Sequence, residues 1–514
     1  MTVVLAGGRI PAVSAFGVSG VDGLVDVVLD EGRISAVQPA GTATDVGTVE
    51  RIPLDGRWVV PGLWDQHVHF TQWAQTARRL DVSRAASAAE AAALVRERAV
   101  RERAAGASGA SGDDVLVGFG FHDALWPDEP TRSLLDAATD RPVVLIAGDL
   151  HCSWLNSAAA RRFAPGTPDA VLREDASFAV TSLLTAADDA TLDRWAADAA
   201  RAAATRGVVG IVDLEYGWNL DVWMRRMGAG GGRGGDGVGR NGGEGDAAGL
   251  RVEFGIYGEH LDRAAGLGLR TGAAIPGTGG LLTVGPFKVI SDGSLNTRTA
   301  LCSHAYPDGG HGVANLTPAE LVERMRFAVD HGLEPAVHAI GDEANRRALD
   351  AFAAISAGGR IEHAQLIDPA DVPRFARLGV TASVQPEHAM DDRDVADRLW
   401  QGRSGRAFPL ADLHAAGARL AFGSDAPVAP LDPWAAIASA VGRTRDGREP
   451  WHPEQAIPAD VALRASTRST LSPGQPADLA VLDRDPLAAS PDELRTMPVA
   501  TTLLAGRVTH DALR

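Results

Sequence analysis

The sequence predicts an α/β fold in which a TIM-type (β/α)8 barrel is joined to one β domain formed by both chain termini. Short apolar runs such as "PVVLIAG" and "GVVGIVDLE" alternate with helical stretches such as "TPAELVERMRFAVDHG" over most of the chain. This alternation is typical of parallel α/β folds. The two ends instead hold β-branched runs punctuated by Gly and Pro, "TVVLAGGRI" at the start and "TTLLAGRVTHD" at the end. A hairpin at either end alone would be marginal, so we expect the ends to form one β domain.

These patterns divide the chain into three parts. The N-terminal part of the β domain takes residues 1–60, the barrel takes residues 61–466, and the C-terminal part of the β domain takes residues 467–514. The stretch from about 72 to 180 holds more elements than one crossover needs, so we expect an insertion there. Residues 228–249 are rich in Gly and follow "VWMRRM" rather than a strand. That context favours a flexible loop over a phosphate-binding one.

Composition excludes several classes of function. The formal net charge is −17, whereas nucleic-acid and anionic-membrane surfaces need clustered cations. No apolar run is long enough to span a bilayer, and "MTVVLAGGRIP" lacks the basic segment of a signal peptide. The only two cysteines, Cys152 and Cys302, lie far apart, so neither a disulfide framework nor a thiolate zinc site is expected. We therefore expect a cytoplasmic protein with a small-molecule substrate and no nucleic-acid or membrane partner, and a homo-oligomer is left open.

Four histidines and an aspartate stand where apolar runs end. His67 and His69, in "VVPGLWDQHVHF", are two apart, so on a strand both would point to the same face. The others are His338 in "PAVHAIGD", His363 in "RIEHAQ" and Asp425 in "AFGSDAP". In a TIM barrel the strand ends form the rim where active sites are built. Each residue alone could be a satisfied polar side chain, but five arriving at the ends of four separate strands favour a metal site.

Lys288, in "GPFKVISDGS", is the only lysine among 49 cationic residues, and it also ends an apolar run. Arginine stays protonated, whereas a buried lysine can lose its proton and act as a nucleophile. Three interpretations follow. The lysine could form a buried ion pair, a Schiff base with a carbonyl substrate, or a carbamate that bridges two cations. A Schiff base would leave the four histidines and Asp425 without a role, whereas a metal site would give a role to each of these residues and to Lys288.

Taken together, these motifs resemble the amidohydrolase superfamily, specifically its amidohydrolase-3 or YtcJ-like branch, which includes N-substituted formamide deformylases. The matching stretches run along nearly the whole chain and also include "DLHCSWLNS", "FKVISDGSLNTRTA" and "GQPADLAVLD". The resemblance implies that the terminal β domain is a composite β-sandwich formed by both chain termini, packed on a metal-bearing (β/α)8 barrel. It also implies a metal-dependent hydrolase with one or two divalent ions, Zn²⁺ in the first place, with Mn²⁺ or Fe²⁺ as alternatives.

By the same resemblance, His67, His69 and Asp425 would bind one metal, His338 and His363 would bind a second, and Lys288 would bridge the two as a carbamate. A metal lowers the pKa of bound water from ~15.7 towards ~7, so a metal-activated hydroxide would attack the carbon of a non-peptide C–N bond, in an amide or an N-substituted formamide. Asp425 would carry the proton to the leaving amine.

Further residues lie in motifs of the same family. His151, Arg298 and Trp154 would bind substrate, although a hydrogen-bonded histidine and a packed tryptophan are equally ordinary. Glu362 would point to the strand face opposite His363 and be structural, Asp292 would form a salt bridge, and His122 matches a variable family position. Two other functions stay open: deamination of a ring amine on the same scaffold, and a non-catalytic amidohydrolase-like oligomeric scaffold.

Overall fold

The architecture comes from a computed structural model, which describes residues 2–13, 16–17, 23–42, 49–104, 115–121, 123, 126–147, 152–184, 188–228, 249–307 and 309–513. The chain divides into two compact units, one made of residues 1–73 and 196–514 and the other of residues 74–195. The segment from about 72 to 180, where we expected an insertion, falls largely in the second unit. Most of the Gly-rich segment 228–249 lies outside the described residues.

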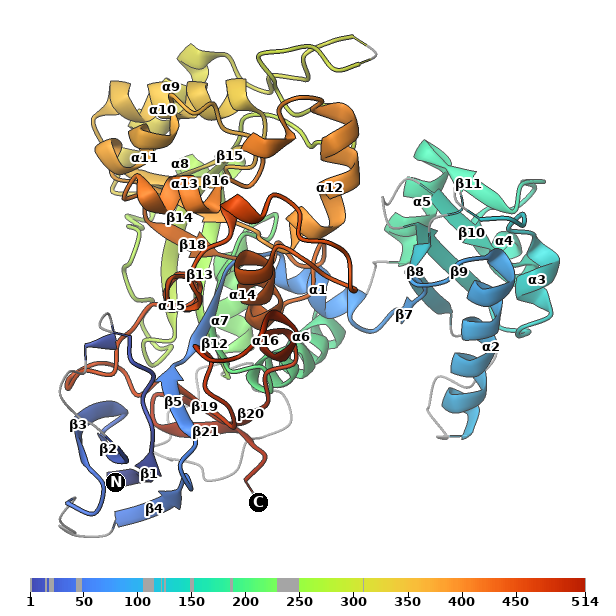
Figure 1. Cartoon of the computed structure of the whole chain (residues 1–514). Coiled ribbons are helices and arrows are strands. Elements are labelled where there is room, and N and C mark those ends of the chain that lie inside the picture. Colours follow the sequence, from blue (N-terminus) through green and yellow to red (C-terminus); the bar gives the residue numbers. More distant parts are fainter. Residues whose placement is uncertain are drawn as a thin grey trace. The chain divides into compact units, whose positions relative to one another are not determined.

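Eight parallel strands form the barrel of the first unit (Figure 1). In sheet order from the first strand they are β6 (Leu63–Val68), β12 (Val208–Asp213), β13 (Arg251–Tyr257), β14 (Leu282–Ile290), β15 (Pro335–Ala339), β16 (Gly359–His363), β17 (Val380–Val384) and β18 (Leu420–Phe422). Strands β6, β12 and β16 are buried along their whole length, as expected for parallel strands covered on both faces. The predicted α/β barrel is confirmed.

Helices join and cover these strands. The helices of this unit include α7 (Asn219–Arg226), α8 (Leu261–Gly266), α9 (Pro318–Asp330), α10 (Asp342–Ile355), α11 (Val372–Leu378), α12 (His388–Leu399), α13 (Leu410–Ala415), α14 (Pro433–Gly442), α15 (Ala459–Ala465) and α16 (Pro491–Arg495). Helix α1 (Phe70–Thr76) leads out of the barrel, and α6 (Asp189–Ala204) leads back. Helix α9 starts at a capping box, in which Thr317 and Glu320 satisfy each other's backbone N–H groups.

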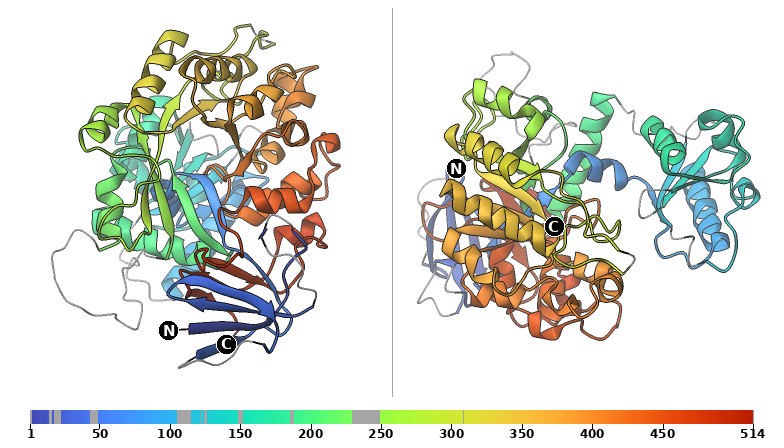
Figure 2. Two further views of the ribbon diagram at one scale, coloured as in Figure 1. Left: turned by 90° about the vertical axis from the view of Figure 1, so that its left-hand side faces the viewer. Right: turned by 90° about the horizontal axis from the view of Figure 1, so that it is seen from above.

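Two four-stranded sheets form the β domain of the same unit, and both ends of the chain contribute strands to it (Figure 2). One contains β1 (Thr2–Gly8), β2 (Val25–Asp30), β3 (Arg33–Pro39) and β4 (Val49–Pro53). The other places β5 (Trp58–Pro61) antiparallel to β19 (Leu479–Leu482), followed by β20 (Val499–Leu504) and β21 (Arg507–Asp511). Strand β5 leads almost directly into β6, so the β domain is tied to the first strand of the barrel.

The second unit is built around a five-stranded sheet of β7 (Leu80–Asp81), β8 (Leu116–Phe121), β9 (Val143–Ala147), β10 (Cys152–Leu155) and β11 (Val171–Arg173). Its helices are α2 (Ala88–Ala104), α3 (Arg132–Asp136), α4 (Ser157–Phe163) and α5 (Glu174–Leu184). Cys152 lies in this unit and Cys302 in the other, and both side chains are buried, as expected.

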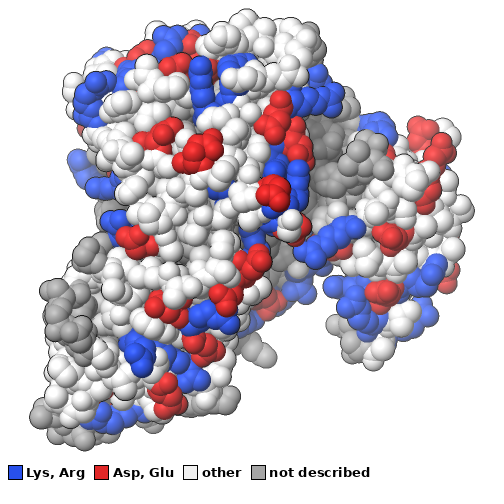
Figure 3. Space-filling model, viewed as in Figure 1, with Lys and Arg blue, Asp and Glu red and all other residues white. Residues whose placement is uncertain are grey.

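The surface mixes charges of both signs. On the visible face of the barrel unit, Lys and Arg side chains are interspersed with Asp and Glu (Figure 3). Among the described residues, no helix is both long enough and apolar enough to cross a membrane.

Candidate metal centre

The C-terminal ends of the barrel strands carry the six predicted ligands. They are His67 on β6, His69 directly after it, Lys288 near the end of β14, His338 on β15, His363 at the end of β16 and Asp425 shortly after β18. The structure brings the four imidazoles together. The ring of His67 lies 5.8 Å from that of His69 and 5.1 Å from that of His363, centroid to centroid. The ring centroids of His338 and His363 are 4.5 Å apart, and the two rings meet edge to face at an angle of 67°.

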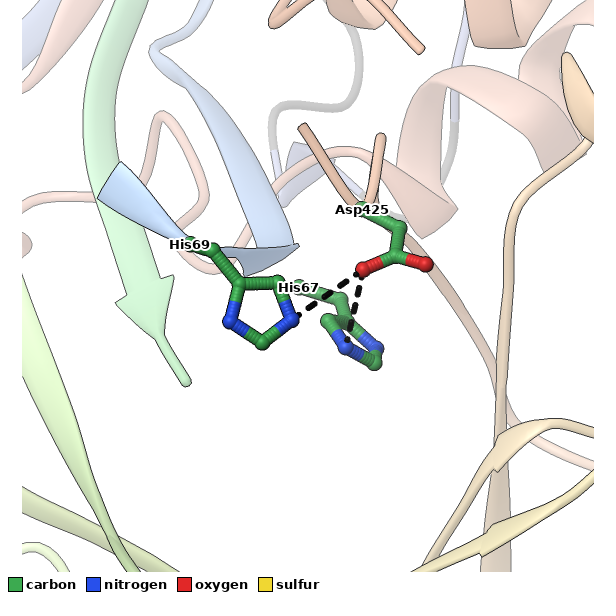
Figure 4. Close-up of side chains that lie close together, drawn as sticks. All are labelled: His67, His69 and Asp425. Carbon is green, nitrogen blue, oxygen red and sulfur yellow. Dashed lines mark ion pairs between the residues drawn. The ribbon is translucent and has the colours of Figure 1, made fainter. Parts of the chain in front are cut away.

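Asp425 links the two histidines of the first strand. Its Oδ1 lies 3.4 Å from Nε2 of both His67 and His69 (Figure 4). Closure of the barrel sets this geometry, because the Asp425 amide donates to the carbonyl of His67 at 2.7 Å. Gly423 permits the close approach, since a Cβ there would lie 2.5 Å from the backbone nitrogen of His67. Asp425 itself has a φ of 56°, a left-handed conformation that aspartate tolerates better than most residues.

Glu362 holds His67 in place, which corrects the expectation that it points away from the site. Its Oε2 accepts a hydrogen bond from Nδ1 of His67 at 2.7 Å, and its Oε1 accepts from Nε of Arg360 at 2.8 Å. The simple alternation of strand faces fails here because His363 has a φ of 73° and ends the strand. Glu362 therefore belongs to the site, where it fixes the tautomer and the orientation of a predicted ligand.

Asp292 does the same for His338. Its Oδ1 lies 3.0 Å from Nδ1 of His338, so the partner of this carboxylate is a predicted ligand, which donates a hydrogen bond to it. The carboxylate is fully buried and also accepts hydrogen bonds from the backbone amides of Leu301, Ile340 and Gly341. With Nδ1 engaged as a donor, Nε2 of His338 carries the lone pair that a metal needs.

Burial and charge set the ionisation of the cluster. Burial, together with the charge of Lys288, lowers the pKa of His67 to about 4. Burial and the neighbouring His338 hold the pKa of His363 well below its usual range. Burial would raise the pKa of Asp425, but the surrounding histidines outweigh that effect and hold it well below its ordinary value. Burial would lower the pKa of His69, but its hydrogen bond to Asp425 and the charge of that carboxylate outweigh this effect and raise it. The lowered pKa values keep His67 and His363 neutral, which is the form of imidazole that binds metals.

Lys288 is buried, and its Nζ has no hydrogen-bond partner within the described part of the chain. Burial lowers the pKa of this amine to about 8, against the opposing charges of Glu362 and Asp425. A cavity of about 640 Å³ opens beside it, lined in part by Tyr257, Asn315 and Arg324.

The nitrogen and oxygen atoms of these side chains are suitable ligands for a metal ion. The buried Nδ1 atoms of His69 and His363 also lack a hydrogen-bond partner among the described residues. Two groups of three side chains place their ligand atoms within 4.8 Å of one another, and Asp425 belongs to both. The first group is His67, His69 and Asp425, and the second is His363, His388 and Asp425. Imidazole and carboxylate donors in this number suit Zn²⁺ and other first-row transition metals.

Two residues of the centre were not predicted from the sequence. His388 follows the apolar run "VTASVQP" and starts a helix, the same kind of position that singled out the other histidines. Asp65, two residues before His67, accepts hydrogen bonds from the amides of His67 and Ser424. Burial raises the pKa of Asp65 to about 7. It thus braces the two backbone segments that carry His67 and Asp425.

The predicted substrate-binding residues lie elsewhere or outside the described residues. Trp154 is fully buried in the second unit, where its Nε1 donates to the carbonyl of Thr131 and its ring contacts Phe121 and Trp126. This environment favours the packing interpretation. Arg298 lies on the exposed segment after β14 with a φ of 58°, and its role stays a prediction. His151 and His122 fall outside the described residues.

Comparisons with known proteins agree with this geometry. A sequence model of the amidohydrolase family matches residues 50–510. The chain is 29% identical to the putative amidohydrolase YtcJ of Bacillus subtilis (strain 168), over 90% of each chain. It is also 29% identical to the N-substituted formamide deformylase of Arthrobacter pascens, over 35% of this chain and 37% of that one. An uncharacterized metal-dependent hydrolase from Pyrococcus horikoshii shares the fold, with a TM-score of 0.74 and 24% identity over 96% of this chain and 99% of that one.

Proposed function

Because the chain belongs to the amidohydrolase family, we propose that it is a metal-dependent hydrolase of a non-peptide C–N bond in an amide or N-substituted formamide. The observation that carries the proposal is the buried cluster of histidines, Asp425 and Lys288, whose nitrogen atoms include several without a partner in the described structure. Similarity to a formamide deformylase supports the substrate class. We propose a small molecule as the substrate.

His67, His69 and Asp425 would hold one ion, and His338 and His363 would hold a second. A bound divalent ion supplies an activated water at neutral pH and polarises the scissile carbonyl. The carboxylate of Asp425, whose pKa the surrounding histidines keep low, is ionised and ready to accept a proton. It would then pass this proton to the nitrogen of the leaving amine as the C–N bond breaks.

We propose that Lys288 serves as a carbamate. Its lowered pKa, caused by burial, leaves part of the amine neutral near pH 8. The neutral amine attacks the carbon of CO2, an N–C bond forms and one proton is released, which leaves an anionic oxygen donor. Arginine cannot make this group because its guanidinium stays protonated.

The decisive experiment measures metal content per chain together with hydrolysis of a panel of N-formyl amines, N-acyl amines and ring amines. We expect about two divalent ions per chain and release of amine from the N-formyl or N-acyl substrates, with no deamination of the ring amines. A chain that carries no divalent ion after growth with zinc or manganese would instead support a non-catalytic scaffold.

The single lysine makes the carbamate directly testable. After equilibration with ¹³C-bicarbonate, one carbamate resonance should appear and should be absent in Lys288→Arg, which we expect to fold but to lose activity. The matched control is Arg326→Lys on exposed helix α9, because it makes the reverse exchange away from the site. Turnover of Lys288→Arg at the wild-type rate would exclude the carbamate role.

A further inference from the structure

His388 is a buried histidine that the proposed roles leave unused. It is the first residue of α12, the helix that follows barrel strand β17, and only 7% of its surface is exposed. It therefore reaches the same rim of the barrel as the six predicted ligands, from a strand that contributes none of them.

Its backbone is firmly anchored. The preceding residue, Glu387, is buried and accepts hydrogen bonds from the guanidinium groups of Arg445 and Arg495, both at 2.9 Å. The hydroxyl of Ser439 donates to the same carboxylate. These contacts tie the start of α12 to α14 and α16, so the position of His388 is set before any ligand binds.

The ring of His388 is also oriented. Its Nε2 donates to the carbonyl oxygen of Ser424 at 3.2 Å, and because a carbonyl can only accept, Nε2 carries the proton. In the neutral ring the other nitrogen then holds a lone pair. Metal-binding histidines typically use one ring nitrogen for the ion and donate the other to a carboxylate or a carbonyl. His67 with Glu362 and His338 with Asp292 follow the same pattern.

His388 lies within reach of a shared ion. One of its ring nitrogens lies within 4.8 Å of ligand atoms of both His363 and Asp425, and the rings of His363 and His388 are stacked at 6.4 Å with an angle of 20°. We propose that His388 is an additional ligand of the metal centre and binds the ion held by His363. The inference rests on the proposed metal-dependent function and adds a nitrogen donor to the ligand set.

The test is metal binding rather than turnover. In His388→Ala we expect the affinity for the second Zn²⁺ to fall about 10-fold or more, as measured by competition with a chelator, because losing a ligand should cost at least as much as losing a ligand's hydrogen-bond partner. The first ion should stay in place. With Co²⁺ in place of Zn²⁺, the visible absorption of the second ion should change, since it reports the donor set directly.

Two further variants make the result interpretable. His388→Asp keeps a metal-binding group at this position, so it should recover part of the affinity that alanine loses, and it serves if His388→Ala folds poorly. His414→Ala, on an exposed turn of α13, is the matched control and should bind both ions as the wild type does.

The outcomes separate this inference from the proposed function. Wild-type affinity and an unchanged Co²⁺ spectrum in His388→Ala would overturn the ligand role, even if KM rose through loss of a substrate contact. A wild-type protein that binds no divalent ion would remove the proposed function itself.

Discussion

The rim of the barrel and the core of the unit formed by residues 74–195 both bury polar side chains, but they treat them differently. In that core, Asn156 accepts hydrogen bonds from the amides of Val143 and Ala159 and donates to the carbonyl of Arg141. At the barrel rim, Lys288 Nζ and the Nδ1 atoms of His69 and His363 have no partner in the described structure. The first arrangement completes a fold, whereas the second leaves donors available.

The difference shows how a site can be distinguished from a core. An unsatisfied buried polar group costs about 1–3 kcal/mol, so folded proteins pair nearly all of them. Several such groups within one cluster indicate that another partner completes it. Variants at the rim should therefore change metal binding and catalysis, whereas variants in the second unit should change only stability.

Asp425→Asn should have the largest effect. The amide keeps an oxygen for the metal but cannot accept and return a proton, so we expect kcat to fall by about 10²- to 10⁴-fold. Steady-state kinetics, with metal content measured on the same samples, checks this. Asp446→Asn, at an exposed turn, is the control. Retention of wild-type kcat by Asp425→Asn would assign the proton transfer to another group.

Glu362→Gln should come next. Glutamine can still meet Nδ1 of His67, but it lacks the charge that pairs with Arg360 and raises the basicity of the imidazole. We expect the metal affinity to fall about 10- to 100-fold, as measured by chelator competition. Glu343→Gln, on α10, should leave metal affinity unchanged. If both variants bound metal equally well, Glu362 would have only a structural role.

Asn156→Ala probes the second unit. It removes the N-cap of α4 and leaves the buried amide of Val143 without its side-chain acceptor. We expect a loss of about 1–3 kcal/mol in the stability of this unit, seen as faster hydrogen exchange in β9 and α4 of the full chain. Metal content should not change. A lower metal content would show that the two units are energetically coupled.

Trp154→Phe should have the smallest effect and decides between the two interpretations of this residue. Phenylalanine fills most of the same space but cannot donate to the carbonyl of Thr131, so we expect a loss of about 0.5–1.5 kcal/mol. KM should stay at its wild-type value. The opposite result, a higher KM with unchanged stability, would favour substrate contact.

Much of this organisation could be predicted from the sequence because it depends on strand ends. The positions of Lys288, His338 and His363 follow from where apolar runs stop, since all parallel strands of a barrel end at one rim. The role of Glu362 could not be predicted, because it depends on the positive φ of His363, and no sequence pattern reports that angle. The contacts of His388 could not be predicted either, because they depend on the anchoring of α12 by side chains from α14 and α16.

The pairing of β5 with β19 has a consequence for how the protein is made. Residues 58–61 leave the ribosome early, but their partner strand at residues 479–482 is synthesised more than 400 residues later. At ordinary rates of translation this delay is roughly 20–80 s. During that interval β5 has an open edge beside the first barrel strand, and open strand edges invite pairing with other chains. Synthesis of residues 479–482 is thus the event that pairs this edge, and chains that terminate before it keep the edge open to aggregation.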